Sequence, residues 1–237
     1  MKQGEILFNN LSSIKDLHMY MTSYPTLSMD SEDFEKVVIE GRNGCLIRNK
    51  GTFPEQELQF TFTKESDNEV LFDLELIQLW LTTYKDNRLY YGRNDKCYRV
   101  KKVVFGDFKQ EVKDTAEITI TFICEPFIYE PVKKEHTITA SNYNFNYTGT
   151  APADTLIKVY GTGNIQLTIN DQTIVLKNVN EVVTIDSNLK QFRDKNGQSK
   201  DLECVGNFIA LDKDDYNVTY TGNVIKIELS YYTAYRQ

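Results

Sequence analysis

Short runs in which apolar and polar residues alternate recur along most of this chain, and turn-forming residues separate them. The clearest runs are LQFTFT at 58–63 and ITITF at 118–122. A period of two places alternate side chains on opposite faces of an extended strand, so each run predicts a strand with one buried face. Asparagine and glycine between runs, as in GRNG at 41–44, tolerate the positive φ of tight turns. A further, charged turn is expected near GD at 106–107. This pattern restricts the chain to a mainly β fold.

One segment has a helical period instead. Apolar residues three or four positions apart share one face of a helix. Such a series is formed by Val70, Leu74, Ile77, Leu81 and Tyr84. The preceding SDNE at 66–69 has the spacing of a capping box, in which a serine and a glutamate satisfy each other's backbone N–H groups. The sequence therefore predicts one helix, over residues 67–84.

Two single residues are candidate structural anchors. Trp80, the only tryptophan, falls near the end of the predicted helix, where a large aromatic side chain is more useful to a core than to a ligand. Pro126 follows a strand-like run, and proline withholds a ladder hydrogen bond. With a second proline at Pro131, it is expected to close the first region. We therefore expect two domains, 1–131 and 132–237.

The second half of the chain is rich in asparagine, threonine and glycine. Its alternating runs are short, and turn-formers at 161–163, 170–171, 178 and 220–223 separate them. Six or more short strands with frequent turns are typical of a β-sandwich. The fold class is therefore an N-terminal β-rich domain with one helix, followed by a β-sandwich.

Composition excludes several classes of function. The 237 residues contain no apolar run near the roughly 20 residues of a membrane span, and the N-terminus lacks an apolar signal core, so we expect no membrane partner and synthesis in the cytoplasm. The net charge of −7 divides into −6 for residues 1–131 and −1 for 132–237. An acidic balance argues against general nucleic-acid binding.

The cysteines and clustered acids do not form an evident metal site. Cys45, Cys97, Cys124 and Cys204 are far apart in sequence, so we expect them to be reduced and buried. The aspartates at 212, 214 and 215 offer oxygen ligands to calcium but lack the glycine and final glutamate of a calcium loop. A solvated acidic turn is the simpler interpretation. No metal and no cofactor is expected.

Basic residues are concentrated between positions 85 and 102. This segment contains seven of them and only two aspartates, with tyrosines between them. Such a mixture can bind phosphates and stacked bases, or it can form a subunit interface. We favour the interface, with inter-subunit salt bridges. The candidate interface residues are Arg88, Arg93, Lys96 and Arg99.

Catalytic constellations are sparse. His18 and His136 are the only histidines, and the sequence has no GxSxG motif and no phosphate-binding glycine loop. His136 is expected in the linker between the domains. The paired carboxylates of a glycosidase leave no sequence signature, so that possibility stays open. We predict that the chain is not an enzyme.

The order of several weak motifs resembles the distal tail protein family of long-tailed bacteriophages, also called the Sipho-tail family. In the first half they are IEGRNG at 39–44, LWL at 79–81, YY at 90–91 and FICEP at 122–126. In the second half they are AP at 151–152, IKVYG at 157–161, GNI at 163–165, IN at 169–170, VTID at 183–186 and GNF at 206–208.

This resemblance implies a structural hub rather than a catalyst. It implies that the first domain assembles into a hexameric ring at the tail tip of the virion and that the second is a galectin-like sandwich facing outward. The implied partners are further copies of the chain, the major tail tube protein, a tail-associated protein and, in many phages, a receptor-binding protein. DNA would only pass through the ring, and the protein would be made in the cytoplasm of the host bacterium.

A second interpretation is a stand-alone carbohydrate-binding protein that recognises a host surface. Sugar rings usually stack on an aromatic side chain and meet a few fixed polar groups. Tyr143, Phe145 and Tyr147 alternate with asparagines and could form such a platform. The same alternation describes one buried face of a strand.

Overall fold

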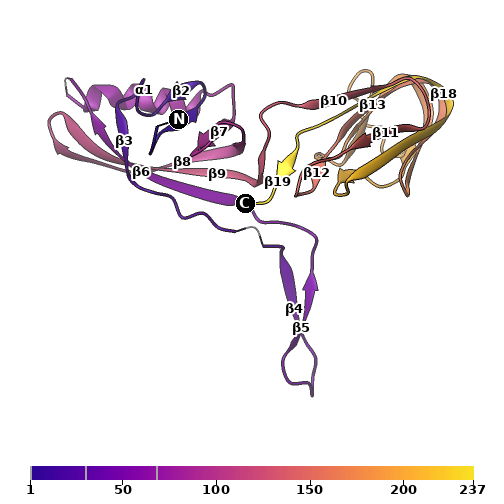
Figure 1. The fold of residues 1–237 in the computed structure, drawn as a ribbon, viewed down its shortest axis with the longest axis horizontal. Coiled ribbons are helices and arrows are strands. Elements are labelled where there is room, and N and C mark those ends of the chain that lie inside the picture. Colours follow the sequence, from indigo (N-terminus) through magenta and orange to yellow (C-terminus); the bar gives the residue numbers. More distant parts are fainter. Residues whose placement is uncertain (1, 30, 68) are drawn as a thin grey trace. The chain divides into compact units, whose positions relative to one another are not determined.

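The computed structural model describes residues 2–29, 31–67 and 69–237, and it is mainly β with one helix, as the sequence predicts (Figure 1). The chain forms two compact units. Unit 1 comprises Met1–Pro131 and Arg236–Gln237, and unit 2 comprises Val132–Tyr235. Each unit has its own sheet and its own apolar core.

Unit 1 contains one large sheet and a separate hairpin. The sheet has the strand order β2-β1-β7-β8-β9-β6-β3, and each of these neighbouring pairs is antiparallel. The hairpin consists of β4 and β5, which pair with each other. The strands are β1 (Ile6–Phe8), β2 (Leu11–Ser12), β3 (Met19–Ser23), β4 (Phe34–Val38), β5 (Cys45–Asn49), β6 (Gln56–Glu65), β7 (Arg88–Tyr91), β8 (Cys97–Val112) and β9 (Thr115–Tyr129).

The single helix, α1 (Leu71–Thr82), is shorter than the sequence suggests at both ends. The expected capping box does not form, since Val70 occupies the N-cap without a side-chain hydrogen bond. The backbone N–H groups of Ser66 and Val70 instead donate to the carbonyls of Asp114 and Lys113, at 2.9 and 3.0 Å. Ser66 and Val70, at the predicted start of the helix, are therefore held by hydrogen bonds to the turn between β8 and β9. Asn68, inside the predicted box, lies outside the described residues.

α1 lies along one face of the sheet of unit 1 (Figure 1). Ile77, Trp80 and Leu81 are its buried residues, on the face that the periodicity predicts. The indole Nε1–H of Trp80 donates to the carbonyl oxygen of Phe8 on β1, at 2.8 Å. The rings of Phe8 and Trp80 meet edge to face, with centroids 5.9 Å apart. One side chain therefore joins the helix to the sheet by both packing and a hydrogen bond.

The alternating run in β6 builds the centre of this core. Leu58, Phe60 and Phe62 are buried, and their register places them opposite Phe122, Ile120 and Ile118 of β9. Directly opposed residues share a face, so the two strands present one continuous apolar surface to α1. The polar residues between them face the other side of the sheet.

Two expected breaks in unit 1 are bulges within long strands. The sequence suggests a turn at Gly106, but β8 continues to Val112, and its register with β9 shifts between Phe105 and Phe108. A Cβ at Gly106 would lie 2.9 Å from the carbonyl oxygen of Thr119. Glycine is needed here because two backbones approach closely, not because the chain reverses.

Pro126 likewise does not end its strand, because β9 runs on to Tyr129. The register of β8 and β9 jumps from Val100 opposite Cys124 to Tyr98 opposite Ile128, so Pro126 lies in a bulge where no ladder N–H is required. Its carbonyl accepts a hydrogen bond from Nε2 of Gln56, at 2.9 Å. The strand therefore ends three residues later, at Tyr129, and the first segment of unit 1 ends at the second proline of the expected pair, Pro131.

Unit 2 is built around three long strands. Its main sheet has the order β10-β18-β13-β14-β15, with β11 pairing with β18 and β16 with β14, and β12 pairs with β17. The strands are β10 (Lys134–Ile138), β11 (Tyr143–Asn146), β12 (Ala153–Asp154), β13 (Leu156–Ile169), β14 (Gln172–Asp186), β15 (Gln191–Asp194), β16 (Cys204–Val205), β17 (Ala210–Leu211), β18 (Asp215–Tyr231) and β19 (Ala234–Tyr235).

Most of the turns expected in this half are also bends inside strands. Residues 161–163, 178 and 220–223 lie within β13, β14 and β18. A Cβ at Gly161 would lie 2.2 Å from the carbonyl oxygen of Asn223 on the neighbouring strand. The turn at 170–171 is correct, and Asn170 there has a positive φ of 50°. The bent strands enclose a sandwich-like core that includes Ile157, Val159, Leu167, Ile174, Val183 and Leu229.

All four cysteines are free thiols. Cys97, Cys124 and Cys204 are buried as expected, and burial raises the pKa of Cys97 to about 11 and that of Cys124 to about 12. Cys45 is exposed, so the expectation that it is buried is wrong. Its strand belongs to the isolated hairpin, which has no core of its own.

Replacing Trp80 by phenylalanine should lower the free energy of unfolding of unit 1 by about 2–4 kcal/mol, because the Phe8 carbonyl loses its donor and the smaller ring leaves a void. Urea denaturation followed by circular dichroism measures this. Gln78→Ala, on an exposed position of the same helix, is the matched control and should change the value by less than about 0.5 kcal/mol. Equal effects of the two changes would contradict the anchoring role.

Candidate functional site

Unit 1 leaves apolar surface uncovered in three places, and the first is the hairpin of β4 and β5. Every residue of both strands is exposed. Among them, Val38 is 81% exposed and Ile47 is 64% exposed. An isolated two-stranded hairpin is at best marginally stable in water, because it has no second layer to cover its side chains. Its composition therefore suits a segment that is covered by another surface.

The outer face of α1 is the second uncovered surface. Phe72, Leu76 and Leu79 follow one another at intervals of four and three, and Phe72 is 74% exposed. The helix is thus apolar on the side that faces away from the sheet as well as on the side that packs against it. A helix that is apolar all round is normally buried on all sides.

The third is the outer edge of β8. In the described part of the chain, β7 pairs with β8 only at Leu89 opposite Tyr98 and Arg88 opposite Arg99. Beyond these pairs, residues 101–112 have β9 on one side and an open edge on the other. Phe105 on this edge is 45% exposed although it stands opposite the fully buried Ile120. An exposed strand edge with apolar side chains is a template for pairing with another chain.

The four basic residues suggested by the sequence all lie on the β7–β8 hairpin. Arg88 and Arg99 are directly opposite each other on the two strands, while Arg93 and Lys96 lie in the connecting turn. The structure thus brings them together on one element.

Three of these cations have acidic partners within the chain. Arg88 binds both carboxylate oxygens of Asp86, with an Nη2–Oδ2 distance of 2.6 Å, and this hydrogen bond lowers the pKa of Asp86. Arg93 pairs with Asp95 and lowers the pKa of that carboxyl to about 2. Arg99 lies 3.9 Å from Glu125. Salt bridges between subunits stay a prediction.

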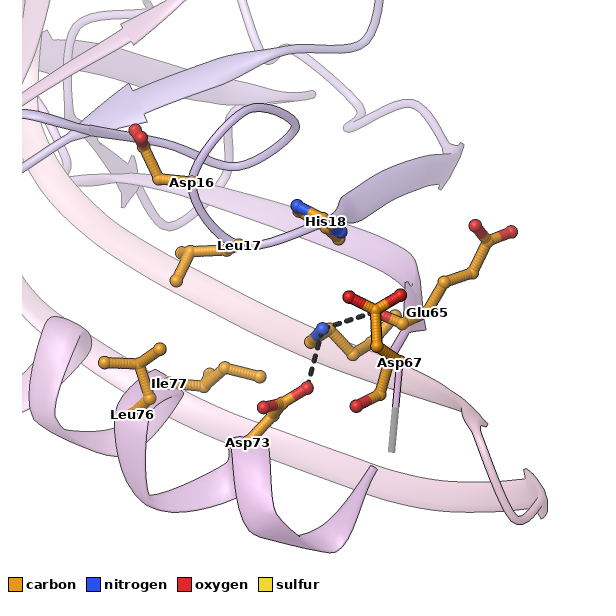
Figure 2. A pocket seen from close by; sticks show the side chains of 10 residues that line it. Asp16, Leu17, His18, Glu65, Asp67, Asp73, Leu76 and Ile77 are labelled. Atoms are coloured by element: carbon orange, nitrogen blue, oxygen red, sulfur yellow. Dashed lines mark hydrogen bonds and ion pairs between the residues drawn. The ribbon is translucent and has the colours of Figure 1, made fainter. Parts of the chain in front are cut away.

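A polar cavity of about 180 Å³ lies where the start of α1 meets the ends of β3 and β6 (Figure 2). Lys64 is almost fully buried there, and its ammonium donates to Asp73 of α1 at 2.8 Å and to the carbonyl of Glu65. Burial opposes ionisation of Asp73, but hydrogen bonds from Lys64 and Ser66 and the charge of Lys64 prevail and lower its pKa. This ion pair fixes the first turn of α1 to β6.

A larger groove of about 540 Å³ in unit 1 is lined by Tyr24, Tyr91, Tyr98, Arg93 and Arg236, among others. Its described lining residues include no carboxylate, histidine or cysteine side chain. The groove therefore offers aromatic rings with phenol groups and cationic side chains.

In unit 2, His136 lies in β10 rather than in a linker, which corrects the sequence expectation. Its ring nitrogens lie 3.2 Å from the hydroxyl of Tyr143 and 3.4 Å from that of Tyr231. Burial lowers the pKa of His136. Its neighbours are aromatic rings and phenols, so this histidine belongs to a packed aromatic cluster.

The aromatic alternation of β11 is a buried face. Phe145 and Tyr147 are buried and Tyr143 is half-buried. The Tyr147 hydroxyl donates to the carbonyl of Ala151 at 2.6 Å. In the acidic loop nearby, the Tyr216 hydroxyl accepts the backbone N–H groups of Asp212 and Lys213, at 2.7 and 3.0 Å. The Tyr216 hydroxyl thus holds the backbone of that loop.

Among the described residues, no group of three or more histidine, cysteine, aspartate or glutamate side chains is arranged to hold a metal ion. Within the same residues, no helix has both the length and the apolar character that crossing a membrane requires.

This chain is similar to known proteins in structure but matches none of the compared sequences. No family model matches the sequence, and no curated protein matches it. A structural match covers 97% of this chain and 98% of the other, with a TM-score of 0.68 and 14% sequence identity. The chain shares the fold of SPP1 Dit. That protein (gp 19.1) is described as a paradigm of the hub adsorption apparatus in phages that infect Gram-positive bacteria.

The similarity to SPP1 Dit extends through both units, since almost the whole of each chain is matched. At 14% identity it establishes the fold. The family suggested by the order of weak motifs in the sequence has this fold.

None of the three uncovered surfaces was identified from the sequence. A signal for the second is present in LFDLELIQLWL at 71–81, where leucines and a phenylalanine occur on every side of the helix. A signal for the first is VVI at 37–39, since consecutive apolar residues fall on both faces of a strand.

Asp73→Asn should destabilise unit 1 at pH 7 by about 2 kcal/mol, because Lys64 stays buried without its counter-charge, although Asp73 is partly exposed. The pKa of Asp73 is lowered by folding, so its stabilisation is present above about pH 4 and is lost as the pH falls below that value. The free energy of unfolding, measured by urea denaturation, should therefore fall less between about pH 7 and pH 2 in the Asp73→Asn variant than in the parent chain.

Asp171→Asn is the control, because its ion pair with Lys213 is largely exposed at both ends. It should change stability by less than about 0.5 kcal/mol at either pH. Parallel pH profiles for the parent chain and Asp73→Asn would contradict the role given to this pair.

Proposed function

We propose that this chain is a distal tail protein, a non-enzymatic structural component of a phage tail tip. In this proposal six copies form a ring through unit 1, and unit 2 is a galectin-like β-sandwich that faces outward. The observation that carries the proposal is the fold similarity to SPP1 Dit over nearly the full length of both chains. The uncovered surfaces of unit 1 support it independently, since they suit a chain that is buried against others.

The open sheet edges suggest how a ring closes. One edge is β3, which pairs with β6 on one side, and the other is the outer part of β8. They belong to different strands, so pairing the β8 edge of one copy with the β3 edge of the next is a head-to-tail contact. Such heterologous contacts close into a ring when the rotation between copies allows it. Phe105, half-exposed at the β8 edge, would then be covered by the neighbour.

The basic β7–β8 hairpin belongs to the same proposed interface. Arg88, Arg93, Lys96 and Arg99 lie next to the start of the open edge. Their pairing with acids of the same chain leaves each ion pair able to join a larger network across a contact. Networks of charges stabilise an interface more than isolated surface pairs do.

The proposed setting is the tip of the tail in the virion, after synthesis in the cytoplasm of the host bacterium. The ring would connect the major tail tube protein to a tail-associated protein, and unit 2 would hold a receptor-binding protein. DNA would pass through the central opening without being held. The net charge of −6 on residues 1–131 fits such a passage, because an acidic surface repels the phosphate backbone.

The alternative, a stand-alone carbohydrate-binding protein, has less support. Its proposed aromatic platform would need exposed rings, and Phe145 and Tyr147 are buried. An oligomeric hub also accounts for the uncovered surfaces of unit 1, which a monomeric lectin does not require.

Size-exclusion chromatography with light scattering should give six times the mass of one chain. Phe105→Lys should shift the mass towards that of one chain, because it places a charge where the neighbour would cover an apolar ring, with little change in the thermal unfolding of the monomer. Phe105→Leu, which keeps an apolar side chain, is the control and should stay hexameric. A monomeric parent chain, or a hexameric Phe105→Lys variant, would contradict this interface.

A further inference from the structure

Two of the uncovered surfaces of unit 1 match each other in chemistry. The first, which we name the hairpin face, is defined by cross-strand register: Lys36 is opposite Ile47 and Val38 is opposite Cys45. Directly opposed residues point to the same side of a hairpin. Asn49 is likewise opposite Phe34, so the hairpin face consists of Phe34, Lys36, Val38, Cys45, Ile47 and Asn49.

The hairpin face has one cation in an apolar surround. Phe34, Val38 and Ile47 are all at least half exposed. The Lys36 ammonium lies 5.8 Å from the centroid of the Phe34 ring, and none of the other members of this face is acidic. The opposite face contains Glu35 and Arg48, which oppose each other.

The second surface, the helix stripe, is the outer face of α1. Its members lie three or four positions apart, and they are Leu71, Phe72, Glu75, Leu76 and Leu79. Glu75 is the one charged member and lies between Leu71 and Leu79, one turn from each. Residues 65–84 contain five acids and no base. The helix stripe therefore has one anionic side chain, Glu75, surrounded by apolar side chains.

The two surfaces also match in length. A strand of five residues extends about 17 Å, and the 12 residues of α1 extend about 18 Å. The hairpin, residues 34–49, carries Lys36, Arg42 and Arg48 against Glu35 and Glu40. The hairpin therefore has a net charge of +1, whereas the charged residues within 65–84 are all acidic.

We propose that the hairpin face of one copy docks on the helix stripe of a neighbouring copy, with Lys36 beside Glu75. This inference rests on the proposed ring and names one of its contacts. Each copy offers one surface of each kind, so the contact is head-to-tail, as ring closure requires. It covers the apolar side chains that neither surface covers within its own chain, and it supplies the second layer that a two-stranded hairpin lacks.

Charge exchange tests the contact. Lys36→Glu alone and Glu75→Lys alone each place like charges together and should weaken assembly about 10- to 100-fold, as measured by native mass spectrometry over a dilution series. The double variant K36E/E75K restores opposite charges and should assemble like the parent chain.

Mixing the two single variants is the sharper test. In an equimolar mixture, the carboxylate introduced by K36E on one copy meets the ammonium introduced by E75K on the next. At the following contact the unchanged Lys36 meets the unchanged Glu75. Alternating copies should therefore form a ring although neither variant does so alone, and an even number of copies, such as six, lets the alternation close. If the hairpin folded back on its own helix, mixing would restore nothing.

The control is the exchange E35K/R48E, which keeps the cross-strand pair on the opposite face of the hairpin and should leave assembly unchanged. The exposed thiol of Cys45 gives a second readout. It should react with a thiol reagent at least about 10-fold more slowly in the assembled parent chain than in the Lys36→Glu variant, because docking covers the hairpin face.

The outcomes separate this contact from the ring itself. A hexameric parent chain whose assembly and Cys45 reactivity are unaffected by both single variants would overturn the docking proposal and leave the ring in place. A parent chain that is monomeric at every concentration would overturn the ring and the docking together. Single variants that fail alone but assemble when mixed would establish the contact.

Discussion

The hydrogen bond from the indole of Trp80 to the carbonyl of Phe8 sets the rotation of α1 on its sheet. With Trp80, Ile77 and Leu81 buried against the sheet, Phe72, Leu76 and Leu79 are left exposed. The buried pair of Lys64 and Asp73 fixes the first turn of the same helix to β6. The apolar outer surface of α1 thus follows from how its inner surface is held.

Unit 1 exposes apolar surfaces that its own chain does not cover. Its sheet has an open edge along β8, its helix is apolar on both sides, and its hairpin has no second layer. A monomeric domain rarely exposes this much contiguous apolar surface, because such patches promote association. The proposed hub would use surfaces of this kind for its contacts, and the chain shares its fold with SPP1 Dit.

The local sequence predicted the buried faces of strands and of the helix better than it predicted where these elements end. The alternation at 58–63 and the inward face of α1 are correct, because burial of an apolar face is a strong local constraint. The turns expected at Gly106 and at 161–163 are bends within strands, since glycine there serves a close approach of two backbones. The capping box fails because distant residues take the N–H groups of Ser66 and Val70. Such contacts between remote segments leave no trace in a local pattern.

The candidate site was less predictable than the fold. The basic residues of the β7–β8 hairpin were identifiable as a cluster in the sequence. Their pairing was not, although Arg88 and Arg93 form ion pairs with Asp86 and Asp95, each only two positions away. The hairpin and the helix stripe are recognisable only after the fold shows that nothing covers them. Whether a side chain is exposed depends on the folded unit. The sequence indicates exposure only where a segment has more apolar residues than one buried face can contain.

Cryo-electron microscopy of the purified chain tests the central claim most directly. The account predicts closed rings with six-fold symmetry and a central opening, in which unit 1 forms the inner wall and the β8 edge of each copy meets its neighbour. Two-fold dimers, open filaments or isolated chains as the dominant particles would contradict it.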